Sequence, residues 1–358
     1  MPSSPSHLAA VPPALAEILQ PQWLTAALGV QFPGIQVTKV TPGPVVSRVS
    51  TNARFRVECA AGVPAGLSPD LCVKSYFGQQ APLARQTGAA EAAFYRDLAP
   101  RIGVRTLRAV FAGVEAGPRQ GVLVTEDVIA QGATFLDATT AYSPDQAAQS
   151  LRQLALLHAA TWGDPAARAA GWLKPRLESH TISRGIREIS ANFDSDLGRG
   201  VPAAVRDAGR LFAAYQELAD VTRGAAPWSV IHGDAHVGNL YLDGQGRPSL
   251  VDWQLVQRGP WYLDVGYHIA SALTVEDRRA HEEGLVRHYL AELRGAGAEP
   301  PGQRDVAVGL RLGILHGFYL WGITQLVARP ITGALLHRLG TAAADHDALT
   351  APAAARSR

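Results

Sequence analysis

The chain has 358 residues, of which 47% are hydrophobic and 18% charged, and its formal net charge is +2. This length and composition predict one large domain or two lobes and exclude a disordered chain. The small net charge does not indicate nucleic acid as a partner. The N-terminus lacks a basic segment, and no apolar run reaches the roughly 18 to 20 residues that a membrane span needs. We therefore expect a cytoplasmic protein without a signal peptide or membrane partner.

Cys59 and Cys72 lie on neighbouring candidate strands, where a disulfide is conceivable. A chain of this size with only two cysteines is more typical of reduced, cytosolic thiols. We expect both cysteines to be free.

The N-terminal part changes from a helical to a strand pattern. Residues 1–12 are expected to be a flexible leader, and Pro13–Leu28 a short helix interrupted near Pro21. From Ile35 apolar and polar residues alternate, as in half-buried strands around Val37 and Phe55–Val57.

The segment 41–54 between those strands is rich in small residues and is predicted to be a loop. Its Ser50, Thr51 and Asn52 carry hydroxyl, amide and backbone N–H groups that suit a phosphate. The segment has no GxGxxG pattern, so an ordinary hairpin loop is an equally good interpretation.

A third strand is predicted at Leu71–Phe77, with Lys74 in its middle. A lysine within an apolar strand is costly unless its ammonium is paired or meets a ligand anion, or unless it faces water on an edge strand. A helix predicted from Pro82 to Leu98 carries Glu91, which could reach Lys74. A surface glutamate is the alternative interpretation of Glu91.

Two more strands are predicted at Val104–Val114 and Gly121–Thr125. The second ends in Glu126-Asp127-Val128, which we interpret as a hinge between a β-rich and a helix-rich half. Backbone groups at Glu126 and Val128 could recognise an adenine edge, whereas Asp127 could cap or brace the turn.

The remainder of the chain is predicted to be mainly helical. Ser143 followed by Pro144 is typical of a helix start, and His158 and His316 are expected to pack or to make one hydrogen bond each. Residues after Asp345 are expected to fray. Further helices are predicted at 205–221, 276–297 and 304–328.

The stretch Val230–Asp252 predicts a strand, a polar loop and a hairpin that turns at residues 243–246. This layout gathers Asp234, Asn239 and Asp252, whose oxygens suit a hard cation such as Mg²⁺. Alternatively, His232, Asp234 and His236 could hold Zn²⁺ in a hydrolase.

These motifs resemble those of the aminoglycoside phosphotransferase and choline-kinase-like enzymes, a family of small-molecule kinases. The resemblance spans about residues 37–270 and rests on Lys74, Glu91 in EAAFYRDL, LVTEDV, LALLHAATW, HGDAHVGNLY and LVDWQ. It implies an α+β, protein-kinase-like two-lobe fold with ATP in the cleft. The β-rich N-lobe would be residues 1–128 and the helical C-lobe residues 129–358.

The resemblance also implies roles for individual residues. Lys74, held by Glu91, would contact the nucleotide phosphates, and Asp234 would be the catalytic carboxylate. Asn239 and Asp252 would bind Mg²⁺. His232 resembles a residue that braces the loop, and Asp264 in GPWYLDVGY either supports the loop or caps its own helix.

The expected function is ATP-dependent transfer of the γ-phosphoryl group to a hydroxyl of a small molecule, with GTP as a possible donor. The acceptor could be an aminoglycoside-like antibiotic, an amino alcohol or another hydroxylated metabolite. Candidate substrate contacts are His236, Gln254, Trp261 and Tyr262. Acidic residues are scattered, which argues weakly against a polycation, and aromatic residues that could cage a cation are present.

Two alternatives remain beside the zinc hydrolase. A non-catalytic nucleotide-binding protein of the same fold is disfavoured because the predicted catalytic residues are intact. A protein kinase is disfavoured because HRD, DFG and APE sequences are not found. The sequence does not indicate an oligomeric state.

Overall fold

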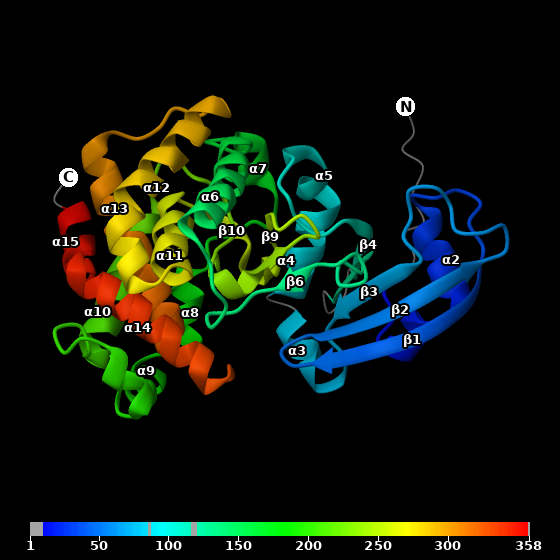
Figure 1. Ribbon diagram of the computed structural model, residues 1–358, viewed down its shortest axis with the longest axis horizontal. Helices are drawn as coiled ribbons and strands as arrows, with labels where there is room; N and C mark the ends of the chain where they lie inside the picture. The colour runs from blue at the N-terminus through cyan, green and yellow to red at the C-terminus, as the bar shows by residue number, and fades with distance from the viewer. Residues whose placement is uncertain (1–9, 85–86, 116–119, 357–358) are drawn as a thin grey trace. The chain divides into compact units, whose positions relative to one another are not determined.

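The computed structural model describes residues 10–84, 87–115 and 120–356 (Figure 1). The chain divides into two compact units. The first ends at Ala133 and also includes Asp252–Gln254, and the second consists of Thr134–Val251 and the residues from Leu255 onward. A short piece of the chain between residues 251 and 255 thus returns to the first unit.

The first unit contains a five-stranded antiparallel sheet in the order β1-β2-β3-β5-β4. Two short helices, α1 (Leu15–Ile18) and α2 (Pro21–Gly29), belong to the same unit, and buried residues of both share a hydrophobic core with the sheet. The strands are β1 (Val37–Ser47), β2 (Thr51–Cys59), β3 (Asp70–Ser75), β4 (Ala109–Val114) and β5 (Gly121–Glu126).

The loop predicted at residues 41–54 is wrong in extent, because most of it is strand. β1 continues to Ser47 and β2 begins at Thr51, so the connection is only residues 48–50. The pairing of β1 with β2 shifts register between Pro42 and Val45. β1 is an edge strand, and an edge strand tolerates proline because one side of its backbone needs no ladder partner.

The helix predicted at residues 82–98 is divided into several pieces. Gly88 lies so close to Gly121 that a Cβ on Gly121 would collide with the Gly88 carbonyl. This close approach fixes the start of the piece that carries Glu91, and a wider π-turn follows it. The pieces are η1 (Gly78–Gln80), α3 (Ala81–Ala84), α4 (Gly88–Ala93), η2 (Phe94–Leu98) and α5 (Ala99–Ile102), and residues 85–86 lie outside the described residues.

The second unit is mainly helical (α11 to α15 run from yellow to red in Figure 1). Helices α11 and α13 pack closely because Gly266 and Gly313 lie at their contact, where a Cβ on Gly313 would collide with the Tyr262 carbonyl. The predicted start of α6 is confirmed, since Ser143 and Gln146 form a capping box. The longer helices are α6 (Pro144–Ala159), α9 (Ile186–Phe193), α10 (Ala208–Arg223), α11 (Tyr262–Ala272), α12 (Val275–Gly295), α13 (Gln303–Gly322) and α14 (Arg329–Asp345), and the shorter ones are α7 (Pro165–Ala169), α8 (Leu177–Ser183) and η3 (Asp196–Gly200).

Two small sheets in the second unit carry the stretch Val230–Val251. The predicted ribbon is confirmed: β8 (Leu240–Leu242) pairs antiparallel with β9 (Pro248–Leu250). β6 (Thr134–Phe135) joins β8, and β10 (Gln257–Gly259) pairs with β7 (Ser229–Ile231). The short elements η4 (Val237–Asn239) and η5 (Trp253–Leu255) flank the hairpin.

The expectation that the chain frays after Asp345 is wrong. Residues Ala348–Thr350 form η6 and Ala351–Arg356 form α15. Ala351 is fully buried, so this alanine-rich end is held by packing rather than by its own helix propensity. The predicted flexible leader falls largely on residues 1–9, which lie outside the described residues.

Two further sequence expectations concern the thiols and the surface. Cys59 and Cys72 are free, and burial raises the pKa of the Cys72 thiol to about 12.

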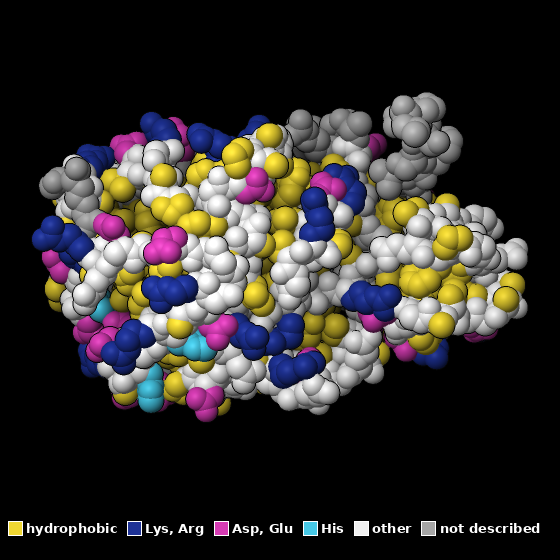
Figure 2. All heavy atoms as spheres, turned by 90° about the horizontal axis from the view of Figure 1, so that it is seen from above, with side chains coloured by type: hydrophobic (Ala, Val, Ile, Leu, Met, Phe, Trp, Pro, Cys, Tyr) yellow, Lys and Arg dark blue, Asp and Glu magenta, His cyan; other side chains and the backbone are white. Residues whose placement is uncertain are grey.

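Among the described helices, none has the length and hydrophobicity that a membrane span requires. Figure 2 shows Lys and Arg side chains intermingled with Asp and Glu side chains on the face in view, as the small net charge implies.

Candidate active site

Lys74 on β3 lies between two carboxylates of the first unit. Its Nζ donates to Glu91 Oε1 at 2.9 Å and to Asp252 Oδ1 at 2.7 Å. The Lys74 side chain is 13% exposed, whereas that of Asp252 is 40% exposed. The pairing with Glu91 is the one expected from the sequence, and the ion pair with Asp252 is additional.

The charges of this cluster depend on one another. Burial alone would lower the pKa of Lys74, but Asp252 and Glu91 raise it, so the ammonium stays charged. Burial raises the pKa of the Glu91 carboxyl, and Asp252 acts in the same direction against the effect of Lys74. One ammonium therefore compensates two carboxylates, and the cluster keeps an excess of negative charge that suits a cation.

The segment after β9 brings Asp252 to the first unit. Asp252 has a φ of 63°, a left-handed conformation that is uncommon for a residue with a side chain. Trp253 holds it: its backbone N–H donates to Glu91, its Nε1 donates to Thr106, and its ring stacks on Phe94 at 3.8 Å between centroids. Strain of this kind persists where the surrounding structure over-determines it.

Ser50 lies in the turn between β1 and β2, and Thr51 and Asn52 are the first residues of β2. The Thr51 hydroxyl donates to Gln80 Oε1 at 2.9 Å, and Gln80 Nε2 donates to Ser47 Oγ at 2.9 Å. Gln80 thus fixes this turn from outside the hairpin. The predicted phosphate contact of the turn stays a prediction, and it depends more on backbone N–H groups than on the Thr51 hydroxyl.

Asp127 braces the segment that follows β5. Its carboxylate accepts a hydrogen bond from Arg54 Nε at 2.6 Å and from the Ile129 N–H at 3.0 Å. The neighbouring Glu126 side chain forms an ion pair with Arg108 at 2.8 Å. Both acidic side chains are therefore engaged within the first unit, as the bracing interpretation of Asp127 requires.

The backbone of Val128 offers one donor to a ligand. Its carbonyl accepts hydrogen bonds from the N–H groups of Gln131 and Ala133 at 3.1 and 2.9 Å, which use both lone pairs. A purine edge would therefore meet the Val128 N–H rather than its carbonyl.

Asp234 lies in the loop after β7 and is held at both carboxylate oxygens. Tyr267 Oη donates to Oδ1 at 3.0 Å, and Asn239 Nδ2 donates to Oδ2 at 3.1 Å. Trp321 Nε1 in turn donates to Tyr267 Oη at 2.7 Å. The Asp234 side chain is still 27% exposed, so a ligand hydroxyl can approach a carboxylate whose orientation is fixed.

Asn239 is oriented by its own amide nitrogen. Nδ2 also donates to the Asp234 carbonyl at 2.8 Å, so Oδ1 is the side-chain atom that can accept a ligand bond. An amide oxygen here and the carboxylate of Asp252 in the first unit are both hard oxygen donors. Their chemistry fits Mg²⁺.

A buried network holds the backbone of the Asp234 loop. The Asp264 carboxylate accepts hydrogen bonds from the His232 N–H at 2.7 Å and the Gly233 N–H at 2.8 Å. His158 Nε2 donates to the same carboxylate at 3.1 Å. Burial alone would raise the pKa of Asp264, but these hydrogen bonds and the nearby histidines lower it. Asp264 therefore supports the loop rather than capping its own helix.

Three more histidines contact the loop through carbonyl groups. His232 Nε2 donates to Val251, His268 Nδ1 donates to Ala235, and His316 Nε2 donates to Gly233. A carbonyl only accepts, so these contacts define which ring nitrogen carries the proton. The other ring nitrogens of His158 and His316 bond to tyrosine hydroxyls, so the expectation of at most one hydrogen bond for each is wrong.

The zinc interpretation of His232, Asp234 and His236 does not fit this geometry. His232 Nδ1 accepts the Asp234 N–H, and its Nε2 is used by Val251. In the described part of the chain, no group of three or more His, Cys, Asp or Glu side chains is arranged to hold a metal ion.

The predicted substrate contacts fall into two groups. Trp261 is 4% exposed and stacks on Tyr289, so it belongs to the helical core. Tyr262 is half-buried and packs against Gly309. The burial of the Trp261 ring does not favour it as a substrate contact. The contact of Tyr262 with a substrate stays a prediction. His236 lies against Trp321 at 5.1 Å between centroids and remains beside Asp234. Gln254 lies in the segment that joins the first unit.

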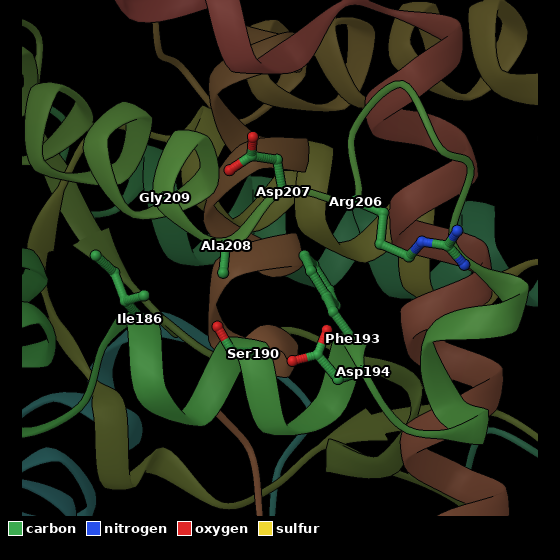
Figure 3. A pocket seen from close by; sticks show the side chains of 8 residues that line it. All are labelled: Ile186, Ser190, Phe193, Asp194, Arg206, Asp207, Ala208 and Gly209. Carbon is green, nitrogen blue, oxygen red and sulfur yellow. The ribbon is translucent and has the colours of Figure 1, made fainter.

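The second unit also has a pocket of about 350 Å³ outside the predicted site (Figure 3). Figure 3 shows Arg206 extending away from Ile186 and Ser190, and this side chain donates to the Gly198 carbonyl. Asp207 caps the start of α10. The pocket is lined by Ile186, Ser190, Phe193, Asp194, Arg206, Asp207, Ala208 and Gly209, none of which was predicted as a site residue.

Sequence reasoning missed residues that act on the site through other residues. Gln80 gave no signal, because a glutamine in a turn is unremarkable in sequence. Tyr267 and Trp321 were recognised only as aromatic residues, and the hydrogen bonds that connect them to Asp234 depend on how α11 and α13 pack.

A buried Lys–Glu–Asp cluster and a loop with an oriented Asp and Asn are features of a phosphoryl-transfer enzyme. The chain belongs to the phosphotransferase enzyme family, whose sequence profile matches residues 48–300. The predicted class, a small-molecule phosphotransferase, is thereby confirmed, and so is the α+β architecture with the sheet before the helical region. No protein of curated function matches the chain significantly in sequence.

Several solved structures are similar to the chain. The choline kinase LicA from Streptococcus pneumoniae has 15% identity and a TM-score of 0.49, with 90% of this chain and 98% of that chain covered. An aminoglycoside-3'-phosphotransferase of type VIII has 21% identity and a TM-score of 0.45, with 81% and 96% covered. A microcompartment-associated aminopropanol kinase has 16% identity and a TM-score of 0.48, with 89% and 95% covered. At these values no substrate is transferred to this chain.

Proposed function

We propose that the protein transfers the γ-phosphoryl group of ATP to a hydroxyl group of a small molecule, with Asp234 as the catalytic carboxylate. The observation that carries this proposal is the fixation of an accessible Asp234 side chain at both oxygens by Tyr267 and Asn239. A general base must be oriented and reachable before its basicity matters.

In the proposed reaction the acceptor hydroxyl donates a hydrogen bond to Asp234, which takes up the proton as the hydroxyl oxygen bonds to the γ-phosphorus. The bond between that phosphorus and the oxygen bridging to the β-phosphate breaks, and ADP leaves. Lys74 holds the phosphates, and its position depends on Glu91. Mg²⁺, for which Asn239 and Asp252 are the proposed ligands, neutralises phosphate charge when it is bound.

The donor is proposed to be ATP, with its purine edge at the Val128 N–H. GTP presents different groups at that edge, so a comparison of the two nucleotides in the same assay tests this part separately.

The test of the reaction is Asp234→Ala. We expect turnover to fall by about a thousandfold, the middle of the range for loss of a general base, with unchanged affinity for nucleotide. Phosphoester formation and calorimetric titration with ATP measure the two quantities. Asp220→Ala, which removes an exposed carboxylate on α10, is the matched control and should leave both unchanged.

Normal turnover in Asp234→Ala would contradict the mechanism. The non-catalytic alternative makes a different prediction: the wild-type protein would bind ATP with millimolar or better affinity and transfer phosphate to no alcohol in a broad panel.

A further inference from the structure

The sheet of the first unit has two faces of different character. One face belongs to the hydrophobic core that the sheet shares with α1 and α2, and its residues on β2 and β3 include Ala53, Phe55, Leu71 and Val73. Successive side chains of a strand point to opposite faces, so the residues that alternate with these four point away from the core. They are Asn52, Arg54, Cys72 and Lys74.

The strand register makes Arg54 a close neighbour of Lys74 on this second face. Asn52 pairs with Lys74, and Arg54 pairs with Cys72. Residues opposite each other on antiparallel strands share a face, and diagonal neighbours such as Arg54 and Lys74 are about 7 to 8 Å apart, within reach of long side chains. All four residues are partly exposed. The second face is therefore polar and accessible around Lys74.

The Cys72 thiol gives a second indication that the two cations lie close together. Burial is the main cause of its raised pKa, and Asp127 raises this pKa further, whereas Arg54 and Lys74 both lower it. The charges of both cations therefore reach the same thiol, in agreement with the register.

One hydrogen bond holds Arg54 toward the segment that follows β5. Arg54 Nε donates to Asp127 Oδ2 at 2.6 Å, and Asp127 Oδ1 accepts the Ile129 N–H at 3.0 Å. The Asp127 side chain is only 7% exposed. Because Asp127 directly precedes Val128, the guanidinium group lies near the backbone N–H that we propose for the purine edge.

The rest of the guanidinium group is not used by the part of the chain that the structure describes. There Nη1 and Nη2 of Arg54 make no hydrogen bond or ion pair, and the side chain is 32% exposed. The guanidinium group is planar, so a bond at Nε orients it and leaves its flat side available. A side chain that is already ordered loses less entropy when a ligand binds.

Arg56 on the same strand provides a contrast. It alternates with Arg54 on the same face, but it pairs with Asp70, one row further from Lys74. Its Nη1 donates to both carboxylate oxygens of Asp70, at 2.7 and 2.6 Å. Arg56 is therefore a matched control for Arg54: the same residue type, strand and kind of partner, at a greater distance from Lys74.

Arg54 lies between the two ends of the proposed nucleotide site. Lys74 is the proposed contact of the phosphates, and the Val128 N–H is the proposed contact of the purine edge. A nucleotide that joins these two points passes across Arg54. Side chains stand roughly perpendicular to a sheet, so a base that lies along this face meets them with its flat side.

We propose that Arg54 contacts the base of the bound nucleotide, with its guanidinium group against the face of the purine. A cation over a ring face is attracted by the π-electrons, and arginine side chains stack on nucleic-acid bases in this way. Both purines present such a face, so the contact does not distinguish adenine from guanine. This assignment rests on the proposed nucleotide binding and specifies which residue recognises the base.

The first experiment separates the base from the phosphates. The wild type and Arg54→Ala are titrated calorimetrically with ATP, GTP and inorganic tripolyphosphate, each with Mg²⁺. We expect Arg54→Ala to raise the Kd of both nucleotides by about tenfold, as for a desolvated cation–π contact, and to leave the Kd of tripolyphosphate unchanged. Arg56→Ala should change none of the three.

Two results of this titration would overturn the proposal. An equal loss of affinity for tripolyphosphate and ATP would show that Arg54 acts on the phosphates. A loss confined to GTP would indicate hydrogen bonds to the guanine edge, since arginine binds guanine O6 and N7.

Arg54→Lys tests the planar group apart from its charge. Lysine keeps the attraction to the phosphates but has no plane to lay against a base. We expect the Kd of ATP to lie between those of the wild type and Arg54→Ala. A Kd equal to that of the wild type would show that charge alone acts on the nucleotide, and would contradict the base contact.

Arg54→Gln guards against a folding defect. Alanine leaves the Asp127 carboxylate without its cation, whereas the glutamine amide still offers a donor on the same strand. Thermal melts of all variants identify those that fold. Arg54→Gln should raise the Kd of ATP by about threefold or more with tripolyphosphate unaffected, and an unchanged Kd of ATP in this folded variant would contradict the proposal.

The outcomes also separate this inference from the proposed reaction. An Arg54-dependent Kd of ATP without phosphoryl transfer to any alcohol would retain the base contact and contradict the reaction. Phosphoryl transfer with the same KM for ATP in the wild type and Arg54→Ala would retain the reaction and contradict the base contact. Failure of the wild type to bind either nucleotide would overturn both.

Discussion

Two buried carboxylates, Glu91 in the first unit and Asp264 in the second, are held by different kinds of partner. Glu91 pairs with the Lys74 ammonium, which it shares with Asp252. Asp264 is held by two backbone N–H groups and His158. Burial raises the pKa of Glu91, whereas hydrogen bonds lower the pKa of Asp264 against the effect of burial.

The difference distinguishes the cluster around Lys74, for which we propose phosphate binding, from the network around Asp264, which supports the loop. Backbone N–H groups are fixed, so Asp264 is permanently satisfied and keeps the loop in one conformation. An ammonium shared between two carboxylates can also turn to a third anion, so the cluster around Lys74 can accept phosphate without unfolding. Variants at the two places should therefore differ in whether stability or binding changes.

The largest effect should come from Asp264→Ala. It would leave the His232 and Gly233 N–H groups buried without an acceptor, so we expect the free energy of unfolding to fall by about 3 to 5 kcal/mol. Urea denaturation measures this change. A loss of less than about 1 kcal/mol would show that the Asp264 network does not hold the loop.

His268 should make the second unit sensitive to acid. Burial is the main cause that lowers its pKa from 6.5 to about 4, so the folded state keeps it neutral while the unfolded state takes up a proton below pH 6.5. Its contribution to stability is complete above pH 6.5 and decreases as the pH falls to 4. Each pH unit in that window corresponds to about 1.4 kcal/mol, so the total is about 3 kcal/mol.

Denaturation midpoints at several pH values between 7 and 4 test this prediction. His268→Gln should be less stable than the wild type at pH 7 and should lose less stability on acidification. Parallel pH curves for the two proteins would contradict the assignment.

Lys74→Ala should affect nucleotide binding more than stability. Loss of a charge-assisted contact with phosphate should raise KM for ATP by about tenfold to a hundredfold. Removing the ammonium also leaves Glu91 and Asp252 close to each other, so a parallel thermal melt is needed. Lys39→Ala, at an exposed ion pair with Glu58, is the control. An unchanged KM for ATP in Lys74→Ala would contradict the proposed contact of Lys74 with the nucleotide phosphates.

Tyr267→Phe should have the smallest effect. It removes one hydrogen bond to Asp234 and leaves the ring in place, so we expect kcat to fall by about threefold to tenfold with KM for ATP unchanged. Trp321→Phe, which releases Tyr267 Oη from its second partner, should give a smaller decrease in the same direction. A change confined to stability in both variants would show that the chain of hydrogen bonds is structural.

The hairpin after Asp234 was predictable from the sequence, because its residues and turn are close together in the chain. The same local character made the start of α6 at Ser143 predictable. The length of β1 was not predictable, since tolerance of Pro42 and Pro44 depends on an edge position in the sheet. The ordered C-terminal end likewise depends on long-range packing of Ala351.

The sequence by itself determined the class of enzyme, because Lys74, Glu91, Asp234, Asn239 and Asp252 are recognisable from residue type and spacing. The tertiary structure decided which groups hold them. Tyr267 and Trp321 reach Asp234, and His158 reaches Asp264, only because helices distant in sequence pack together. The same packing brings the Arg176 N–H to Gln257 and His316 to the Gly233 carbonyl. Sequence periodicity does not predict such contacts, because it contains no information on segments that are distant in the chain.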